Sequence, residues 1–138
     1  MQSEAHDVTG DIPTIYKLVS AASWRQAETL GRFIGSAVDI ADGYIHCSTA
    51  AQVADTGARH FAGVSDLLLV AVATADIEAA LRWEPSRGGH LFPHVYGDLP
   101  LSAVRSVTPV PIGVDGRHVW PDHLAGPGSS GGSDARNA

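Results

Sequence analysis

The sequence predicts one domain of the α+β class, with a mixed β-sheet core and two to three short helices. Two observations carry this prediction. The chain has 138 residues, of which 44% are hydrophobic and 17% charged, enough for a single globular domain with a hydrophobic core. Strand-forming runs and helix-start signals follow one another in a mixed order, roughly strand, helix, strand, helix, strand, helix, loop and strand.

The first strand and the first helix are expected near the start of the domain. The run TIYKLVS, residues 14–20, is rich in β-forming residues and predicts a strand. In the following SWRQAETLGRFIG, Ser23 and Gln26 have the spacing of a capping box, so we expect a short helix to start at Trp24.

A second strand and helix are expected next. DGYIHCS, residues 42–48, opens with an Asp-Gly turn signal and continues as a strand. Thr49 and Gln52 form a second capping box, and the helix that they open is expected to run to about Phe61 and to stop at Gly63.

The second half of the chain is expected to contain two further strands, a helix and a long loop. DLLLVAVAT, residues 66–74, is apolar throughout, which is typical of a strand buried on both faces. DIEAALRW, residues 76–83, predicts a short helix that Pro85 ends. Residues 88–104 predict a long loop with short extended pieces, and residues 103–116 predict a last strand before an Asp-Gly turn.

The ends of the chain differ in composition from its middle. Residues 1–11 are polar and are expected to be flexible, and residues 124–138 form a Gly- and Ser-rich segment with too little apolar surface to order itself. We therefore expect one domain over residues 12–123.

Charge and cysteine content exclude several classes of function. The formal net charge is −6 and no basic stripe is present, so general nucleic-acid binding is not expected. A single cysteine, Cys47, allows no internal disulfide. No signal peptide is visible and the longest apolar run, residues 67–73, is too short to cross a bilayer, so we expect a cytoplasmic protein without membrane contact. The sequence does not show whether the chain has a protein partner.

The segment DGYIHCST is the first candidate for chemistry. Side chains alternate along a strand, which places Ile45 and Cys47 on one face and Tyr44, His46 and Ser48 on the other. Because they point apart, His46 and Cys47 are not expected to act as a nucleophile–base pair, and Cys47 is interpreted as a small buried apolar residue. His46 is either a structural strand histidine or one member of a hydrogen-bonding patch.

The segment RWEPSRGGHLFPHVYG is the second candidate. It gathers five residues with chemically useful side chains, namely Glu84, Arg87, His90, His94 and Tyr96. Pro93 favours an extended backbone before it, and His94 and Tyr96 then lie on the same side of a short strand-like piece. The segment is either a functional loop or a surface loop whose aromatic residues cover the edge of the core.

Standard motifs for metals, hydrolases and nucleotides are not found. His90 and His94 are four residues apart, but Pro93 opposes the helix that would make them a ligand pair. There is no CxxC or HExxH motif, so no metal is expected. Nor is there a GxSxG elbow, a Walker A loop or a Rossmann glycine pattern.

Together these segments resemble one small bacterial family. The chain is similar to the DUF952 family, proteins of unknown function, from about Ile15 to Pro121. The segments that carry the resemblance are YKL, the Trp-led helix, DIADGYIHCSTAAQV, DLLLVAV and LRWEPSRGGHLFPHVYG. The resemblance implies an ADP-ribosyltransferase-like fold, a split mixed β structure that elsewhere holds NAD in a cleft between two sheets.

The same resemblance implies roles for particular residues. His46 would hydrogen-bond the ribose or nicotinamide part of NAD, and Tyr96 would stack on nicotinamide. Glu84 would steer a ribose hydroxyl or stabilise an oxocarbenium-like transition state. Tyr44 and Ser48 would orient the ligand together with His46, and Arg87 would bind a phosphate through two hydrogen bonds.

Three functions stay open at this point. In the first, the chain would bind NAD or a related nucleotide and transfer or hydrolyse ADP-ribose. In the second, it would be a non-catalytic module that binds a nucleotide or another small molecule. The third alternative is an acid–base enzyme that uses His46 and His94 on a non-nucleotide substrate. The position of Glu84 relative to His46 separates the first two, and a cleft too small or too acidic for a pyrophosphate would favour the third.

Overall fold

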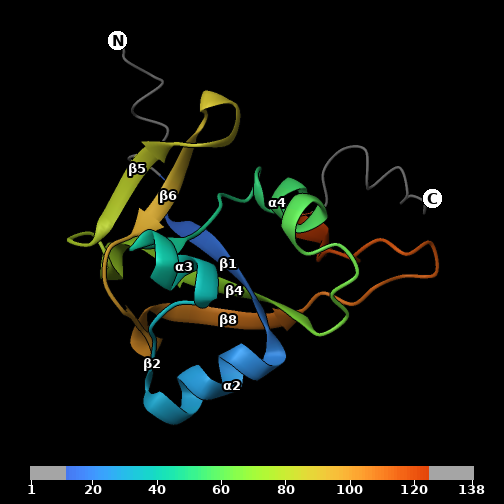
Figure 1. Ribbon diagram of the computed structural model, residues 1–138, viewed down its shortest axis with the longest axis horizontal. Coiled ribbons are helices and arrows are strands. Elements are labelled where there is room, and N and C mark those ends of the chain that lie inside the picture. Colours follow the sequence, from blue (N-terminus) through green and yellow to red (C-terminus); the bar gives the residue numbers. More distant parts are fainter. Residues whose placement is uncertain (1–11, 125–138) are drawn as a thin grey trace.

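The computed structural model describes residues 12–124 of the chain, so the expectations for residues 1–11 and 125–138 lie outside the described residues. The described part is a mixed α+β fold, as predicted, with three helices and three antiparallel sheets (Figure 1). Leu124, at the boundary expected for the C-terminal segment, is buried in a hydrophobic cluster.

The central sheet contains the two strands that the sequence predicts most directly. Its order is β1 (Thr14–Ser20), β4 (Leu67–Ala73) and β8 (Val104–Pro109), with every neighbouring pair antiparallel. Side chains of β4 alternate between two hydrophobic clusters, one containing Val70 and Val72 and the other containing Leu69. This burial on both faces explains why the strand has no polar residue.

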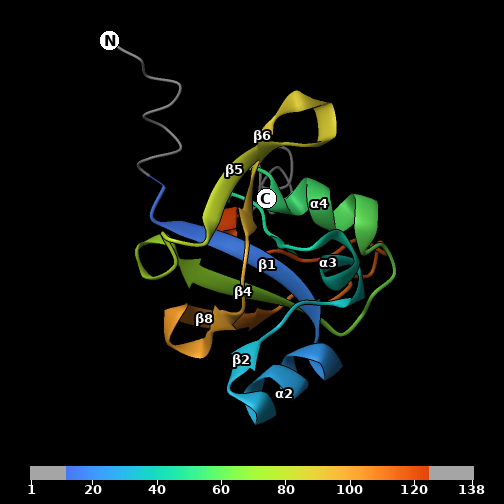
Figure 2. The same cartoon turned by 60° about the vertical axis from the view of Figure 1, so that its left-hand side comes forward.

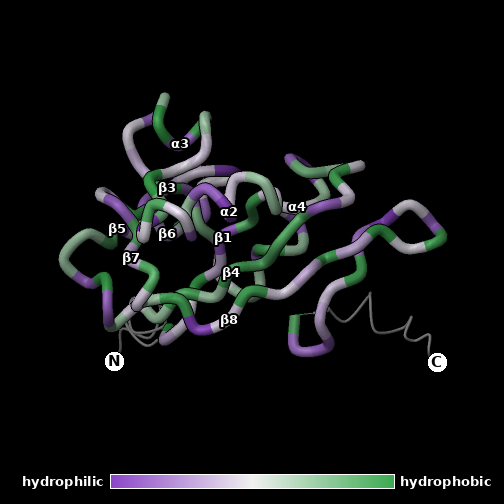
Figure 3. The backbone as a smooth tube through the Cα atoms, turned by 90° about the horizontal axis from the view of Figure 1, so that it is seen from below, coloured by the Kyte–Doolittle hydropathy of each residue, from purple (hydrophilic) through white to green (hydrophobic). Residues whose placement is uncertain are grey.

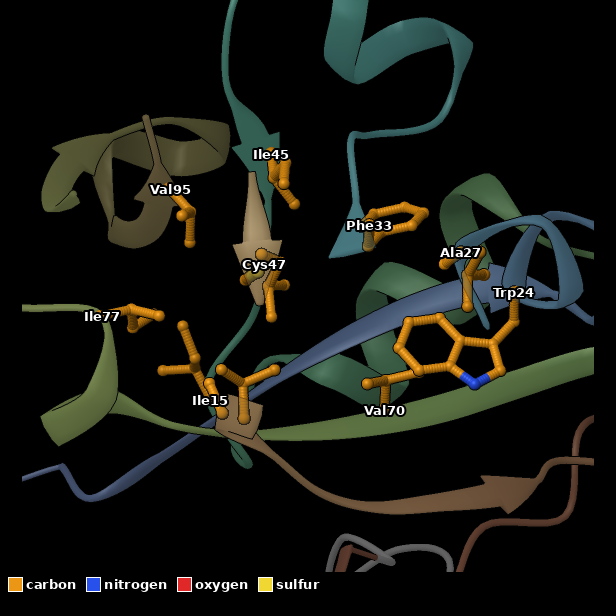
Figure 4. Packing of buried hydrophobic residues seen from close by; sticks show 13 residues of the cluster. Ile15, Trp24, Ala27, Phe33, Ile45, Cys47, Val70, Ile77 and Val95 are labelled. Atoms are coloured by element: carbon orange, nitrogen blue, oxygen red, sulfur yellow. The ribbon is translucent and has the colours of Figure 1, made fainter. Parts of the chain in front are cut away.

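The first cluster fills the space between the central sheet and the rest of the domain. Figure 4 shows Ile15 and Val70 of that sheet packed with Trp24, Phe33 and other residues from different elements. In the hydropathy colouring of Figure 3, β4 is correspondingly green.

A second three-stranded sheet carries the residues of interest. It contains β3 (Ile45–His46), β6 (Leu91–Val95) and β5 (Leu81–Pro85), with β6 in the middle. β5 and β6 form a hairpin arm that projects from the body of the molecule (Figures 1 and 2). A two-stranded sheet of β2 (Arg32–Phe33) and β7 (Leu99–Pro100) completes the β structure.

The helices are α2, α3 and α4, which span Ala21–Leu30, Ala37–Asp42 and Val53–His60. Short 3-10 turns occur at Thr74–Asp76, Arg87–Gly89, Leu101–Ala103 and Asp122–Leu124.

Two helix starts differ from the prediction. α2 begins earlier than Trp24, because the side chain of Ser20 caps it by accepting a hydrogen bond from the Ser23 backbone at 3.2 Å. At α4 half of the expected capping box forms, since the Gln52 side chain accepts a 2.9 Å hydrogen bond from the backbone N–H of Thr49, but the helix itself starts at Val53.

The helix predicted over residues 76–83 and the loop predicted over 88–104 are wrong. Residues 81–85 form β5 and residues 91–95 form β6, in a hairpin whose register pairs Trp83 with Pro93. Leu81 and Trp83 pack against the core while Arg82 between them is exposed, a period of two that pairing with β6 enforces over helix propensity.

The Asp-Gly pair at residues 42–43 was predicted to be a turn before a long strand. It instead ends α3, where Gly43 adopts a left-handed conformation with φ of 90° that a residue without a side chain takes at low cost. The strand that follows is short, Ile45–His46, because the chain then leaves β6 and pairs Ser48 with Tyr16 of β1.

Candidate functional site

The sheet formed by β3, β6 and β5 has one face in the core and one face outside. Ile45 and Val95 are register partners and both belong to the hydrophobic core. His46 and His94 are the next pair, so they point to the opposite face together. We call this second face the outer face. Glu84 lies on it as well, at an alternate position of β5, and so do the rings of Tyr44, directly before β3, and Tyr96, directly after β6.

His46 is held at both ring nitrogens by carboxylates of α3. Its Nδ1 lies 2.6 Å from Oδ1 of Asp39, and its Nε2 lies 2.9 Å from Oδ2 of Asp42. Asp39 is 1% exposed and Asp42 is 47% exposed. The Nδ1 contact is therefore buried and fixed, whereas the Nε2 contact is at the surface, and His46 itself is 32% exposed.

Asp39 is the electrostatic centre of the site. Lys17, which is 4% exposed, lies 2.8 Å from Oδ2 of Asp39. The carboxylate also accepts hydrogen bonds from the backbone and hydroxyl of Ser36 and from the backbone N–H of His46. Burial by itself raises the pKa of Asp39, but the charge of Lys17 and these hydrogen bonds outweigh it and bring the pKa to about 2. Asp39 is thus an ionised carboxylate at neutral pH.

A second histidine–carboxylate pair stands beside the first. Nδ1 of His94 lies 2.7 Å from Oε1 of Glu84, and the hydroxyl of Tyr96 donates to the same oxygen at 2.8 Å. The hydrogen bonds from His94 and Tyr96 lower the pKa of Glu84, and the hydrogen bond to Glu84 raises the pKa of Tyr96.

Tyr44 joins the two pairs into one cluster. Its ring centroid lies 4.2 Å from that of His94 in a stacked arrangement, 4.6 Å from that of His46 and 5.2 Å from that of Tyr96. The two imidazole rings are 5.6 Å apart. We call these residues, together with Lys17, Asp39, Asp42 and Glu84, the outer-face cluster.

Of the residues predicted to form the site, Tyr44, His46, Glu84, His94 and Tyr96 are brought together. The expectation that the segment containing Glu84 is a loop is wrong, since Glu84 lies on β5 and contacts both His94 and Tyr96.

Ser48 and Arg87 were predicted to share the site and are not in the cluster. The hydroxyl of Ser48 is buried and lies 2.9 Å from that of Thr56 in α4, since the chain has already left β6 at this point. Arg87 also contacts Thr56, at 3.2 Å, and its guanidinium lies 4.8 Å from the centroid of the Phe92 ring.

Arg87 instead lines a separate cavity of about 1070 Å³. It lies between the start of β1, the segment leading into α4 and the tip of the β5–β6 arm, and none of the four rings of the outer-face cluster lines it.

Lys17, Asp39 and Asp42 were missed by sequence reasoning. One signal was available: in β1, Lys17 occupies the alternate position between Ile15 and Val19, both of which face the core. A lysine at such a position needs a buried anion, because an unpaired charge is not tolerated there.

Cys47 plays no part in the outer-face cluster. It is buried in the core as predicted, and burial raises the pKa of its thiol to about 12. Over residues 12–124, no group of three or more His, Cys, Asp or Glu side chains is placed to hold a metal ion. No helix in the same range is long and apolar enough to span a membrane.

Comparisons with known proteins agree on the family and the fold. The family model described as "Protein of unknown function (DUF952)" matches residues 18–107, more than half of the chain. The crystal structure of protein CC0527 from Caulobacter crescentus is 45% identical, with a TM-score of 0.77 over 81% of this chain and 98% of that chain. The solution NMR structure of CC0527 gives a TM-score of 0.72 at 45% identity, over 81% of this chain and 97% of that chain. No curated protein matches the chain.

Proposed function

We propose, from the premise that this chain belongs to the DUF952 family, that its outer-face cluster binds a small flat molecule and catalyses proton transfer through His46. The observation that carries this proposal is the contact between Nδ1 of the part-exposed His46 and the buried, ionised Asp39. The function of the family is unknown, so the proposal rests on geometry alone.

The Asp39–His46 contact has the properties that acid–base catalysis needs. A carboxylate on Nδ1 fixes the orientation and tautomer of an imidazole, so that a proton is taken up or given at Nε2. Burial keeps the carboxylate in place, and Lys17 keeps it ionised at neutral pH. Nε2 faces the surface, where its present partner Asp42 is half exposed and free to yield to a substrate.

The remaining members of the cluster supply binding contacts. Tyr44 and Tyr96 present partly exposed rings on which a flat molecule can stack. The Tyr96 hydroxyl donates to Glu84 on the same face as His46, so a substrate that displaces Asp42 from Nε2 of His46 would contact both groups.

An acidic environment favours this chemistry over pyrophosphate binding at the cluster. Three carboxylates, Asp39, Asp42 and Glu84, lie beside the histidines, against two cations, Lys17 on Asp39 and Arg82 near Glu84, whereas Arg87 lies outside the cluster. A pyrophosphate at the cluster would therefore meet a net negative charge, and a neutral or cationic substrate is not repelled by it.

Hydrolysis of 4-nitrophenyl acetate tests the proposal, because this ester has a flat ring and releases a coloured product. We expect the wild type to be faster than His46→Gln by about 100-fold, the lower range for general-base catalysis. The matched control is His123→Gln, which changes an exposed histidine outside the cluster and away from the cavity lined by Arg87, and should leave the rate unchanged. Equal rates for the wild type and a folded His46→Gln variant would refute the proposal.

A second candidate is binding of NAD or a related nucleotide with transfer or hydrolysis of ADP-ribose. It is supported by the position of Glu84, which contacts Tyr96 in the same cluster as His46. Positive charge develops at the ribose when the nicotinamide bond breaks, and a carboxylate beside it would stabilise that charge.

A thermal-shift titration with NAD, ADP-ribose and nicotinamide tests this candidate. A ligand at about 100 times its dissociation constant adds roughly 2.7 kcal/mol to the stability of the folded state. We expect the shift to disappear in His46→Ala and nicotinamide release to fall in Glu84→Gln. No shift with any of the three compounds would exclude the candidate and leave the proton-transfer proposal standing.

A further inference from the structure

We infer that the cavity lined by Arg87 is a second ligand site, for a small molecule that joins a flat apolar ring to an anionic group such as a carboxylate or a phosphate. The cavity is open to solvent and has a volume of about 1070 Å³, and its lining includes Tyr16, Arg59, Trp83, Arg87 and Phe92. Figure 2 shows the tip of the β5–β6 arm, which carries Arg87, on the same side of the molecule as α4. This site is independent of the proposed function, because no residue of the outer-face cluster lines it.

An excess of positive charge in the cavity selects an anion. Two guanidiniums share one carboxylate there: Nε of Arg59 lies 2.9 Å from Oδ2 of Asp55, and Nη2 of Arg87 lies 3.3 Å from the same oxygen. Asp55 is the single acidic residue among the described residues that line the cavity. One positive charge is therefore unbalanced, in a chain whose formal net charge is −6.

Arg87 is held in a geometry suited to anion binding. Its guanidinium lies over the ring of Phe92 and donates to Oγ1 of Thr56 at 3.2 Å. These contacts fix the plane of the guanidinium, so little conformational entropy is lost when it binds a carboxylate or phosphate through two parallel hydrogen bonds. The positive φ angles of Gly88 and Gly89, 69° and 79°, allow the tight turn that follows Arg87 at the tip of the arm.

The apolar part of the lining selects the ring. Trp83 is half-buried, and Leu91, next to Phe92, is an exposed large hydrophobic residue. Aromatic and aliphatic side chains around one fixed charged group are the usual composition of a small-molecule site. A ligand that lacks the charge loses the contact with Arg87, and a ligand that lacks the ring loses the contacts with the apolar side chains. Either ligand should therefore bind more weakly.

NMR titration of the full chain tests the inference, with the indole N–H signal of Trp83 as the reporter. The probes are phenyl phosphate and benzoate, and the single-feature controls are benzyl alcohol and inorganic phosphate. We expect a saturable shift of the Trp83 signal with phenyl phosphate, benzoate or both, and at least about tenfold weaker binding of either control. A preference between the two probes assigns the anion as phosphate or carboxylate.

Substitutions connect the binding to Arg87. Arg87→Gln should weaken binding of the preferred probe by about tenfold, the loss expected for one charged hydrogen-bond partner. Arg105→Gln is the control, since Arg105 is also paired with a carboxylate, at 2.7 Å from Asp76, but is exposed and does not line the cavity. His46→Gln should leave the binding intact, which separates this site from the outer-face cluster.

Three results would overturn the inference. The first is an unchanged Trp83 signal with both anionic probes. The second is undiminished binding in Arg87→Gln, and Arg59→Gln repeats this comparison if Arg87→Gln is unfolded. The third is inorganic phosphate or benzyl alcohol binding as tightly as the better probe, since the lining would then select only one of the two features.

Discussion

Replacing Asp39 with asparagine removes the one charge that pairs with Lys17 in the interior. Lys17 is 4% exposed and Asp39 is 1% exposed, so water cannot take over from the lost carboxylate. The asparagine keeps the size of the side chain but only one of the two acceptor oxygens, so it can serve either Ser36, which donates to Oδ2, or His46, which donates to Oδ1. The variant therefore loses the hydrogen bonds on one side of the carboxylate, and the charge of Lys17 is left without a partner.

The structure gives two routes to the size of the effect. Removing one partner of a buried ion pair costs about 3–5 kcal/mol. The pKa of Asp39 falls from 3.8 to about 2, which at 1.36 kcal/mol per pKa unit corresponds to about 2 kcal/mol between its charged and neutral forms. We therefore expect Asp39→Asn to lose about 2–4 kcal/mol at pH 7, out of a total of roughly 5–15 kcal/mol for a domain of this kind.

Urea unfolding followed by circular dichroism measures this loss, with Asp42→Asn as the control. Asp42 lies on the same helix and contacts the same histidine, but it is half exposed and pairs with no buried cation. Its replacement should cost less than about 0.5 kcal/mol. A loss of less than about 1 kcal/mol in Asp39→Asn would refute the argument that Asp39 neutralises Lys17.

The pH dependence has a definite sign. Because the pKa of Asp39 is lowered in the folded state, its stabilising contribution is complete above about pH 4 and is lost as the pH falls from about 4 to about 2. Asp39→Asn has no such contribution to lose. The difference in unfolding free energy between the wild type and the variant should shrink over this range, and a difference that stays constant from pH 7 to pH 2 would contradict the assignment.

Three further predictions follow from individual contacts. Glu84→Gln should lower the pKa of Tyr96, because the hydrogen bond to the carboxylate raises it; absorbance at 295 nm during a pH titration measures this, with Tyr96→Phe to identify the signal. Gly57→Ala should lower the urea midpoint, because a Cβ atom there would lie 2.6 Å from the ring of Trp120. Overpacking costs about 1–3 kcal/mol, which exceeds or matches the gain of about 1 kcal/mol in helix propensity. A raised midpoint would show that Trp120 moves aside freely. Cys47 should resist iodoacetamide at pH 8 in the folded protein, because burial raises its pKa to about 12, and labelling as fast as in urea-unfolded protein would contradict its placement in the core.

The parts of the fold that depend on local pattern could be predicted from the sequence. β1 and β4 lie where the runs TIYKLVS and DLLLVAVAT place them, because both runs are rich in β-forming residues and β4, buried on both faces, is apolar throughout. The alternation of side chains along a strand placed His94 and Tyr96 on one side of a strand and His46 on the face opposite Cys47. Those residues entered the candidate site because their orientation depends on local geometry alone.

The parts that depend on distant partners could not be predicted. Residues 76–83 contain good helix formers, and their strand conformation over 81–85 comes from pairing with β6. The separation of Arg87 from the outer-face cluster follows from contacts with α4, which no local pattern reveals. α3 was missed because it is six residues long and its apolar residues Val38 and Ile40 are exposed, so that it has no amphipathic period.

The composition of α3 bears on whether the outer-face cluster is only structural. Asp39 is the one buried residue of this helix, and a helix of six residues without an apolar face is not stable by propensity or packing. α3 is therefore held to the body by the bonds of Asp39 to Lys17 and His46. A purely structural attachment would be better served by apolar residues at positions 17 and 39, because a buried ion pair gives no more stability than well-packed hydrophobic side chains. What the ion pair provides, and apolar residues could not, is a carboxylate of fixed charge and position on Nδ1 of His46, with a second carboxylate from the end of the same helix on Nε2. This arrangement is the reason for assigning the cluster to proton transfer.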